Sequence, residues 1–327
     1  MSEPPRSPAT SADLPEATAA ERLVGDSVLG GTPADAGTVQ EAAVTAMTAG
    51  GRARKRGKLG IAAWLAIFWM GLLVFAAVFA SFLPLDDPVN SVDASAIGKG
   101  SSADHVMGVD SNGRDVLSRV VFGIRASLEI GVGSVAIGFV VGGFLGLVGG
   151  YFKGRIGSLI AGLLDTLLAF PSLILALAIV AFLGQTTLNI TIALAIVATP
   201  ILARIARASA LSWSEREFVL AARAQGAKHF RIIWREIFPN VLPAMLSIAV
   251  LGIAVAIVAE GGLSVLGVGV KLPTPSWGNI IQGGLPDLRT APNIVLFPSM
   301  VIFLTVLSLN YLGDVIRARF DVRESGL

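Results

Sequence analysis

The chain has 327 residues, of which 54% are hydrophobic and only 15% are charged, and it contains no cysteine. A soluble domain usually carries about 25% charged residues, so this chain cannot cover a solvated surface unless much of that surface faces lipid. The lack of cysteine excludes a disulfide framework, a thiolate metal site and a thiol nucleophile. The composition therefore predicts a membrane protein, and the formal net charge of +2 hides charges that are segregated along the sequence.

The first 50 residues differ in composition from the rest of the chain. They contain seven acidic residues, two basic residues and no aromatic residue, and they are rich in Ala, Ser, Pro, Thr and Gly. This composition is typical of a disordered acidic tail and unlike that of an organelle transit peptide. No apolar segment precedes residue 59, so the basic cluster at 52–58 and the apolar run after it predict an uncleaved signal anchor.

Five stretches of the sequence contain no charged residue: 59–85, 130–152, 166–203, 237–259 and 290–313. A transmembrane helix needs about 20 apolar residues, so the third stretch, which is interrupted by the polar segment 184–189, divides into two spans. The stretches are continuous rather than alternating, which favours helices over barrel strands. We therefore predict an all-α membrane protein with six transmembrane helices at roughly 59–83, 128–151, 157–183, 189–208, 241–263 and 293–313. The second span is rich in glycine, which predicts close packing against a neighbouring helix.

Lysine and arginine are distributed unequally between the two sides of this predicted bundle. If both termini lie on one side, that side carries 17 of the basic residues flanking the spans and the other side carries 6. Because cytoplasmic segments are enriched in Lys and Arg, we place both termini in the cytoplasm. The predicted parts are the acidic tail (1–50), a basic anchor with the first span and an extracytoplasmic loop (51–127), a transmembrane core with a large cytoplasmic loop at 209–243 (128–323), and a C-terminal tail (324–327).

Sequence motifs for catalysis and nucleotide binding are absent. Gly57-Lys58 is the nearest approach to a phosphate-binding loop, but Leu59 follows it and Arg52 occupies the position of the first glycine. The chain has neither an HExxH nor a GxSxG motif, and no paired histidine and carboxylate are evident. We therefore expect no enzymatic activity and no ATP site on this chain.

The cytoplasmic loop between the fourth and fifth spans has the composition of a short surface helix. Residues 215–225 are mostly good helix formers, with acidic residues in the first turn and Gly226 directly after the last residue. A second amphipathic stretch, 228–238, ends at Pro239, where we expect the fifth span to begin. Two adjacent alanines in the first stretch leave room for a partner to approach, although a basic helix lying on anionic lipid headgroups has the same composition.

This loop resembles the EAA loop of bacterial ABC-importer permeases, whose pattern is Glu-Ala-Ala, three residues, Gly, about nine residues and Ile-x-Leu-Pro. The residues in register are Ala221, Ala222, Gly226 and Pro239, and those that depart from the pattern are Leu220, Glu236 and Phe238. Ile237 lies one residue after the missing isoleucine, and we expect it to take over the packing of that residue. The apolar Leu220 cannot make the polar contact to an ATPase that a glutamate there makes.

The segment His105–Arg119 resembles the HxxGTDxxGRDxxSR signature of the dipeptide, oligopeptide and nickel permease family, with Val109 where threonine is usual. Three further segments are similar to this family: the acidic, proline-interrupted third span, the fifth span with its loop at 260–278, and the residues Asn310–Asp314. The similarity covers roughly residues 58–323, although the end of the chain departs from the usual finish, and it is strongest to the C-type subunit.

The resemblance implies a type I ABC importer permease fold with a cytoplasmic coupling helix, in the plasma (inner) membrane of a prokaryote. The implied partners are a second, B-type permease, two cytoplasmic ATPase subunits that bind ATP and Mg, an extracytoplasmic substrate-binding protein, a di- or oligopeptide substrate and membrane lipid. It implies no nucleic acid and no cofactor on this chain. The residues that it places at the ATPase contact are Glu217, Phe218, Ala221, Ala222, Arg223, Gln225, Gly226 and Ala227.

Two carboxylates lie within or beside the predicted spans. Asp165 is about 12 Å inside the third span, at about 1.5 Å per residue. A carboxylate at that depth either pairs with a cation such as Arg204 or lines the transport pathway beside the kink at Pro171. Glu260 is expected at the extracytoplasmic rim. Two roles are compatible with that position: part of a gate, or a contact for the binding protein.

The extracytoplasmic signature also contains residue types that bind metals. His105, Asp110 and Asp115 are loosely spaced and no second histidine is near, so we expect no metal site. The two aspartates are expected to cap a helix or to pair with Arg114 and Arg119, while Asn112-Gly113 favours a tight turn.

Three other functions compete with the peptide importer. A stand-alone secondary transporter requires more intramembrane ionisable residues, and internal repeats, than the sequence shows. A membrane-embedded enzyme requires a catalytic constellation that is missing. An ABC permease for nickel, glutathione or another small solute remains open, because cargo choice rests on the binding protein and both permeases together.

Overall fold

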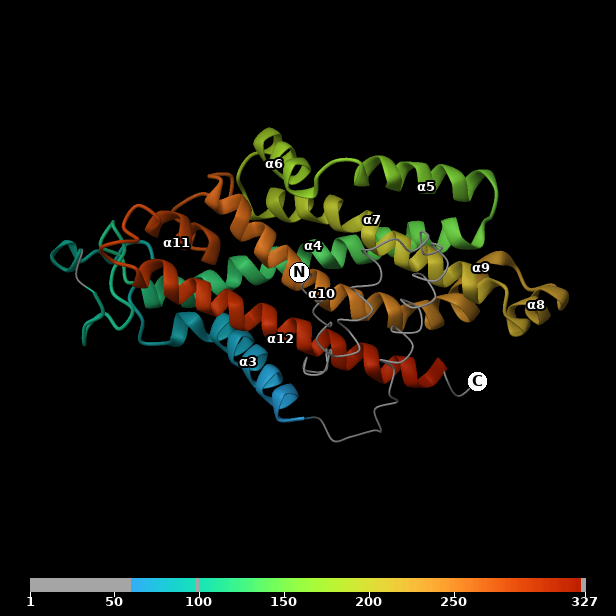
Figure 1. Ribbon diagram of the computed structural model, residues 1–327, viewed down its shortest axis with the longest axis horizontal. Coiled ribbons are helices and arrows are strands. Elements are labelled where there is room, and N and C mark those ends of the chain that lie inside the picture. Colours follow the sequence, from blue (N-terminus) through green and yellow to red (C-terminus); the bar gives the residue numbers. More distant parts are fainter. Residues whose placement is uncertain (1–59, 98–99, 325–327) are drawn as a thin grey trace, which may run out of the picture. The chain divides into compact units, whose positions relative to one another are not determined.

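The computed structural model describes residues 60–97 and 100–324, with side chains described as far as residue 319. The predicted acidic tail (1–50), the basic cluster (52–58) and residues 325–327 lie outside the described residues. Helices dominate the described part of the chain (Figure 1). In chain order they are α3 (Ile61–Phe79), η1 (Ala80–Phe82), η2 (Ala94–Ala96), α4 (Val116–Tyr151), α5 (Arg155–Leu168), α6 (Ser172–Leu183), α7 (Thr187–Ser214), α8 (Glu217–Ala224), α9 (His229–Arg231), the π-helical η3 (Ile232–Ile237), α10 (Phe238–Val265), α11 (Trp277–Gly284) and α12 (Asn293–Glu324).

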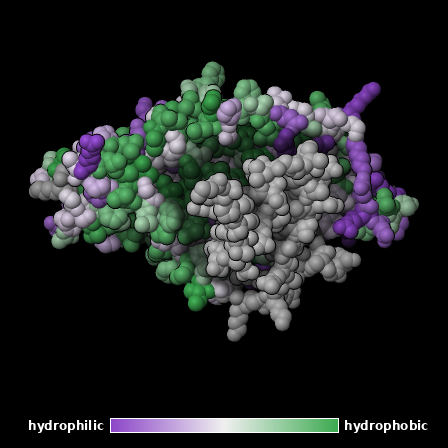
Figure 2. Space-filling model, viewed as in Figure 1, coloured by the Kyte–Doolittle hydropathy of each residue, from purple (hydrophilic) through white to green (hydrophobic). Residues whose placement is uncertain are grey.

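Five helical segments in the described ranges are long and apolar enough to cross a membrane, and α5 with α6 makes a sixth if the bent pair is one span. Their outward surfaces are apolar, since Trp64 and Phe68 on α3 and Val140 and Phe144 on α4 are all exposed. Figure 2 shows hydrophobic residues between the two ends of the molecule and hydrophilic residues at both ends, including the end that carries α8. The all-α membrane fold expected from the sequence is therefore confirmed.

The third predicted span, 157–183, is not one straight helix. α5 and α6 are bent by 85° at a short break that contains Pro171. The proline ring fixes φ, offers no N–H to donate and disfavours helical geometry at the residue before it. Pro200, by contrast, remains inside the continuous helix α7. Pro171 thus lies at a full change of chain direction, whereas the helix continues through Pro200.

Helix α4 is much longer than the predicted second span, 128–151. It begins at Val116 because the side chain of Asp115 accepts a hydrogen bond from the backbone N–H of Ser118, at 2.7 Å, and so caps the helix. Its 36 residues correspond to about 54 Å at about 1.5 Å per residue, well beyond the hydrocarbon thickness. The helix thus begins before the predicted span, because charged residues end an apolar run without ending a helix.

Glycines on α4 bring its backbone against α7, as the composition of the second span predicts. A Cβ atom on Gly142 would lie 2.6 Å from the carbonyl oxygen of Thr199, and one on Gly150 would lie 2.7 Å from that of Arg207. No real side chain fits at these distances, so the two helices approach as closely as glycine allows. This packing fixes α7, which leads into the cytoplasmic loop, against α4.

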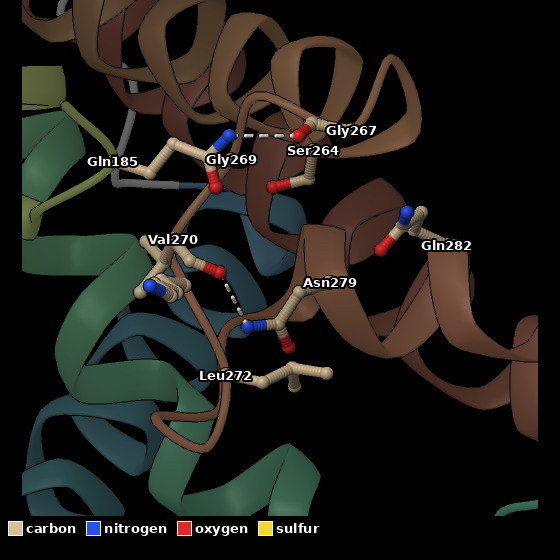
Figure 3. Close-up of a pocket in the computed structure, with 9 residues that line it drawn as sticks. Gln185, Ser264, Gly267, Gly269, Val270, Leu272, Asn279 and Gln282 are labelled. Carbon is tan, nitrogen blue, oxygen red and sulfur yellow. Dashed lines mark hydrogen bonds between the residues drawn. The ribbon is translucent and has the colours of Figure 1, made fainter. Parts of the chain in front are cut away.

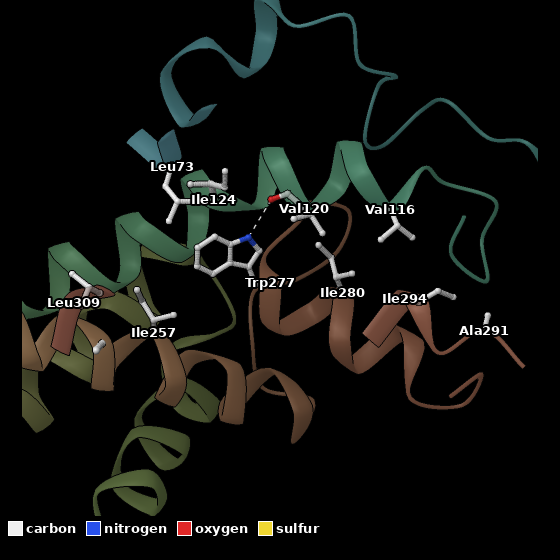
Figure 4. Packing of buried hydrophobic residues seen from close by; sticks show 11 residues of the cluster. Leu73, Val116, Val120, Ile124, Ile257, Trp277, Ile280, Ala291, Ile294 and Leu309 are labelled. Carbon is white, nitrogen blue, oxygen red and sulfur yellow. Dashed lines mark hydrogen bonds between the residues drawn. The ribbon is translucent and has the colours of Figure 1, made fainter. Parts of the chain in front are cut away.

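Trp277 forms the centre of the core at the extracytoplasmic end (Figure 4). The indole is fully buried, and its Nε1–H donates to the carbonyl oxygen of Val120 at 3.1 Å. The backbone N–H of Trp277 donates to Ser127 Oγ, also at 3.1 Å. Ser276 begins α11 with a capping box that it shares with Asn279. These contacts bind the short helix α11 to α4.

Candidate functional site

The cytoplasmic loop folds as the predicted short helix with a glycine stop. α8 spans Glu217–Ala224, and Gly226 follows it with φ +80°. The N–H of Gly226 donates to the carbonyl oxygen of Arg223 at 2.9 Å, and the N–H of Ala227 donates to that of Ala222 at 3.0 Å. This pair of bonds is a Schellman motif, whose left-handed position favours glycine. Gly226 therefore sets the angle at which the chain leaves α8.

One face of α8 is seated on the protein and the other is open. Val219 is fully buried in a cytoplasmic core cluster with Tyr151, Ile232 and Ile237, and Ala222 packs against the same cluster. The remaining residues of the predicted coupling set are exposed, namely Glu217, Phe218, Ala221, Arg223, Gln225 and Gly226, with Ala227 half-buried. Leu220, at the position of the missing glutamate, is 50% exposed on the open face.

Ile237 takes the packing position that the sequence assigns to it, since it is fully buried in the cytoplasmic cluster. The helix around it is π-helical over Ile232–Ile237, a geometry that accommodates an extra residue per turn. The chain then continues as one helical segment from His229 to Val265. α10 itself begins at Phe238 with Pro239 in its first turn, as the sequence predicts, and the helical segment before it continues into α10 because a proline in a first turn does not interrupt a helix.

Asp165 and Arg204 form the ion pair that the sequence leaves as one of two alternatives. Arg204 Nη2 lies 2.5 Å from Asp165 Oδ1 and joins α5 to α7. Their side chains are 59% and 58% exposed, among exposed apolar residues such as Leu163 and Ile201. Charged groups exposed inside a membrane face a cavity or a partner rather than lipid.

Glu260 is fully buried rather than at an accessible rim. Its Oε1 accepts hydrogen bonds from the hydroxyls of Ser264, at 2.9 Å, and Ser276, at 2.8 Å, whereas Oε2 has no partner among the described residues. The carboxylate thus connects α10 to the start of α11. Direct contact of Glu260 with another protein requires this arrangement to open.

A cavity of about 280 Å³ lies beside these residues (Figure 3). It is lined by Gln185, Ser264, Gly267, Gly269, Val270, Lys271, Leu272, Asn279 and Gln282. The Gln185 side chain donates to the carbonyl oxygen of Gly267 at 3.0 Å, and Asn279 Nδ2 donates to that of Val270 at 3.2 Å. The loop after α10 is therefore held from both sides.

The extracytoplasmic signature folds as a cap at the start of α4. Gly113 turns the chain with φ +78°, and Asp110 lies 3.5 Å from Arg119, so the predicted turn and pairing are confirmed. His105 lies between two carboxylates, with Nδ1 3.0 Å from Asp115 and Nε2 3.5 Å from Asp93. The hydrogen bond to Asp115 raises the pKa of His105.

His105 pairs with Asp93, which precedes it in the chain, and with Asp115, which follows it. The sequence did not predict this pairing, because no local pattern links the three residues. The two carboxylates bind opposite nitrogens of the ring, so the three groups do not converge on one point. Within the described ranges, no cluster of three or more His, Cys, Asp and Glu residues is arranged to hold a metal ion.

Comparison with known proteins identifies the class. Residues 138–325 match the family of binding-protein-dependent transport system inner membrane components. The glutathione transport system permease protein GsiD of Pectobacterium atrosepticum is 36% identical over 250 residues, which are 76% of this chain and 83% of that protein. The dipeptide transport system permease protein DppC of Alkalihalophilus pseudofirmus is 37% identical over 267 residues, 82% of this chain and 86% of that protein.

A solved structure has the same fold. The inward-facing MetNI methionine ABC transporter superposes with a TM-score of 0.53 and 18% identity, over 62% of this chain and 96% of that chain.

The chain therefore belongs to the family of binding-protein-dependent transport system inner membrane components. It is a multi-pass permease subunit of an ABC importer in the bacterial inner membrane, and ATP is hydrolysed on partner subunits. This membership removes the stand-alone secondary transporter and the membrane-embedded enzyme as alternatives.

Proposed function

We propose that this chain forms, with a second permease of B type, the pathway through which small peptides cross the membrane. The relatives named for dipeptide and glutathione transport support this proposal, because both cargoes are short peptides with free carboxylate and amide groups. The signature at His105–Arg119, which resembles that of peptide and nickel permeases, also supports it. An extracytoplasmic binding protein delivers the substrate, and two ATPase subunits drive its passage.

We propose that α8 is the coupling helix on which an ATPase subunit docks. The observation that carries this assignment is the two-sided placement of α8: Val219 anchors it to the core, while Phe218 and Leu220 are 41% and 50% exposed. Large apolar side chains exposed at the hydrophilic end of a membrane protein are suited to a protein partner. The docking set is Glu217, Phe218, Ala221, Ala222, Arg223, Gln225, Gly226 and Ala227.

Asp165 and Pro171 are assigned to the transport pathway. The support is that an exposed ion pair lies at membrane depth directly before the 85° break between α5 and α6. Glu260 is assigned to the extracytoplasmic gate, where its carboxylate holds the start of α11. Neither region needs to undergo a chemical reaction, because the pathway changes only by movement of helices.

The test of peptide transport is uptake into cells that lack this chain and are complemented with it. Labelled dipeptide, tripeptide, glutathione and nickel are offered separately, and each is competed with the others. The proposal is supported if the chain restores uptake of a short peptide and if other peptides, but not nickel, compete with that uptake. Restored uptake of nickel alone, without competition by peptides, overturns the peptide assignment and leaves the permease role intact.

A further inference from the structure

Tyr151 lies at the junction between α4 and the cytoplasmic loop at 209–243, called the coupling loop below. It is the last residue of α4 and is buried in the cytoplasmic core cluster. Its hydroxyl oxygen lies 2.7 Å from His229 Nδ1, a hydrogen bond between residues 78 positions apart. The two rings also meet edge to face, with centroids 5.6 Å apart, and Phe152 contacts both.

The same side chain also touches the other arm of the coupling loop. The guanidinium carbon of Arg223, near the end of α8, lies 5.0 Å from the centroid of the Tyr151 ring. Arg223 precedes the turn at Gly226 and His229 follows it. Tyr151 therefore holds both arms of this turn, one through its ring face and the other through its hydroxyl.

The far end of α4 reaches the extracytoplasmic gate. Val120 and Ser127 of α4 accept both hydrogen bonds of Trp277, the first residue of α11. Ser276, one residue earlier, donates to Glu260. One continuous helix thus has the coupling loop at one end and the base of the extracytoplasmic loop at the other, and α7 is packed along its length by glycines.

We infer that Tyr151 is a positioning residue that transfers movement of α8 to α4. The inference rests on the proposed coupling role of α8. The hydroxyl bond to His229 fixes the angle between the loop and the end of α4, so displacement of α8 by an ATPase moves α4 instead of bending the turn at Gly226. Without this bond the loop still docks on the ATPase, but the connection between the loop and α4 is looser.

The test is the amount of peptide transported per ATP hydrolysed by the complete complex in proteoliposomes. Tyr151→Phe removes only the hydroxyl and keeps the ring that packs on Arg223. Tyr311→Phe is the matched control, since Tyr311 is the other tyrosine of the chain and its hydroxyl makes no hydrogen bond among the described residues. We expect Tyr151→Phe to lower transport per ATP about fivefold, the factor that corresponds to one hydrogen bond, and Tyr311→Phe to leave it unchanged.

A double variant tests whether the two partners act as one link. His229→Phe keeps an aromatic ring against Phe152 and removes Nδ1, so it should lower the ratio as Tyr151→Phe does. The double variant should lower it no further than either single one. Additive losses overturn the inference, because they show that the two side chains act separately.

Assembly is measured by co-purification of all subunits with each variant. If Tyr151→Phe reduces assembly and uptake together but leaves transport per ATP unchanged, Tyr151 only packs the core and the inference is overturned. If Tyr151→Phe assembles normally and its transport per ATP is unchanged, the inference is also overturned. The proposed role of α8 is still supported in that case if a Gly226 variant loses coupling. If the Gly226 variant also couples normally, the proposed function of α8 itself fails.

Discussion

Two helices in the described part of the chain have eight residues each, α8 on the predicted cytoplasmic side and α11 on the other, and they are held in opposite ways. α11 begins with a capping box, and five of its residues are buried. α8 has no side-chain cap at its start, and Val219 is its one buried residue. α11 therefore belongs to the rigid body of the spans, whereas α8 is attached along one edge and leaves its other face open.

Removing the anchor of α11 should have the largest effect. Trp277→Ala deletes a fully buried indole and its hydrogen bond to the carbonyl oxygen of Val120 on α4, and it should destabilise the protein by about 3–5 kcal/mol. Thermal unfolding in detergent measures the change. Trp64→Ala, at a side chain 61% exposed on α3, is the control and should have little effect. Equal losses in the two variants would contradict the rigid attachment of α11.

A change at the end of α8 should instead leave stability nearly intact and abolish coupling. Gly226→Val forces a β-branched residue into φ +80°, a conformation that costs ordinary residues about 1–2 kcal/mol, although no atom lies within 4 Å of its Cβ position. We expect normal membrane insertion and assembly, with ATP hydrolysis no longer linked to uptake. Gly154→Val has the same φ and the same open surroundings at another turn, and it should remain coupled. Normal uptake by Gly226→Val would show that the direction of α8 is unimportant.

The extracytoplasmic cap should show a smaller, pH-dependent effect. The folded pKa of His105 is raised by its bond to Asp115. Its stabilisation is therefore fully present below the unfolded pKa of about 6.5 and is lost as pH rises through the higher folded value. Limited proteolysis of the loop at 86–115 should accelerate across that range. His105→Gln should remove the pH dependence; if the wild-type rate is constant or falls with pH, the ion-pairing account of the cap is wrong.

The sequence predicted those features that depend on local chemistry. The span count follows from uncharged runs, and the stop at Gly226 follows from a glycine after a run of helix formers. The predictions failed where remote residues decide the structure. The sequence places Glu260 at an accessible rim, whereas its carboxylate is buried and accepts a hydrogen bond from Ser276, sixteen positions away.

The proposed coupling site was predicted only in part, because some of its contacts join residues far apart in the chain. The exposed helix α8 and the packing of Ile237 follow from the loop sequence, whereas the contact of Tyr151 with His229 joins two elements far apart in the chain. Ser276 and Asn279 had a recognisable signal, because a serine three residues before a polar side chain favours a capping box. Nothing in the local sequence pairs Tyr151 with His229.

Site-specific crosslinking in the intact complex tests directly whether α8 is the docking site for an ATPase subunit. The chain has no cysteine, so an introduced cysteine carries a maleimide photo-crosslinker at one position only. Leu220→Cys places the probe on the open face of α8, and Leu159→Cys places it on α5, at a side chain 76% exposed. We predict a crosslinked product with the ATPase from position 220 and none from position 159. An assembled complex that gives no ATPase product from position 220, or gives it equally from both positions, would contradict the account.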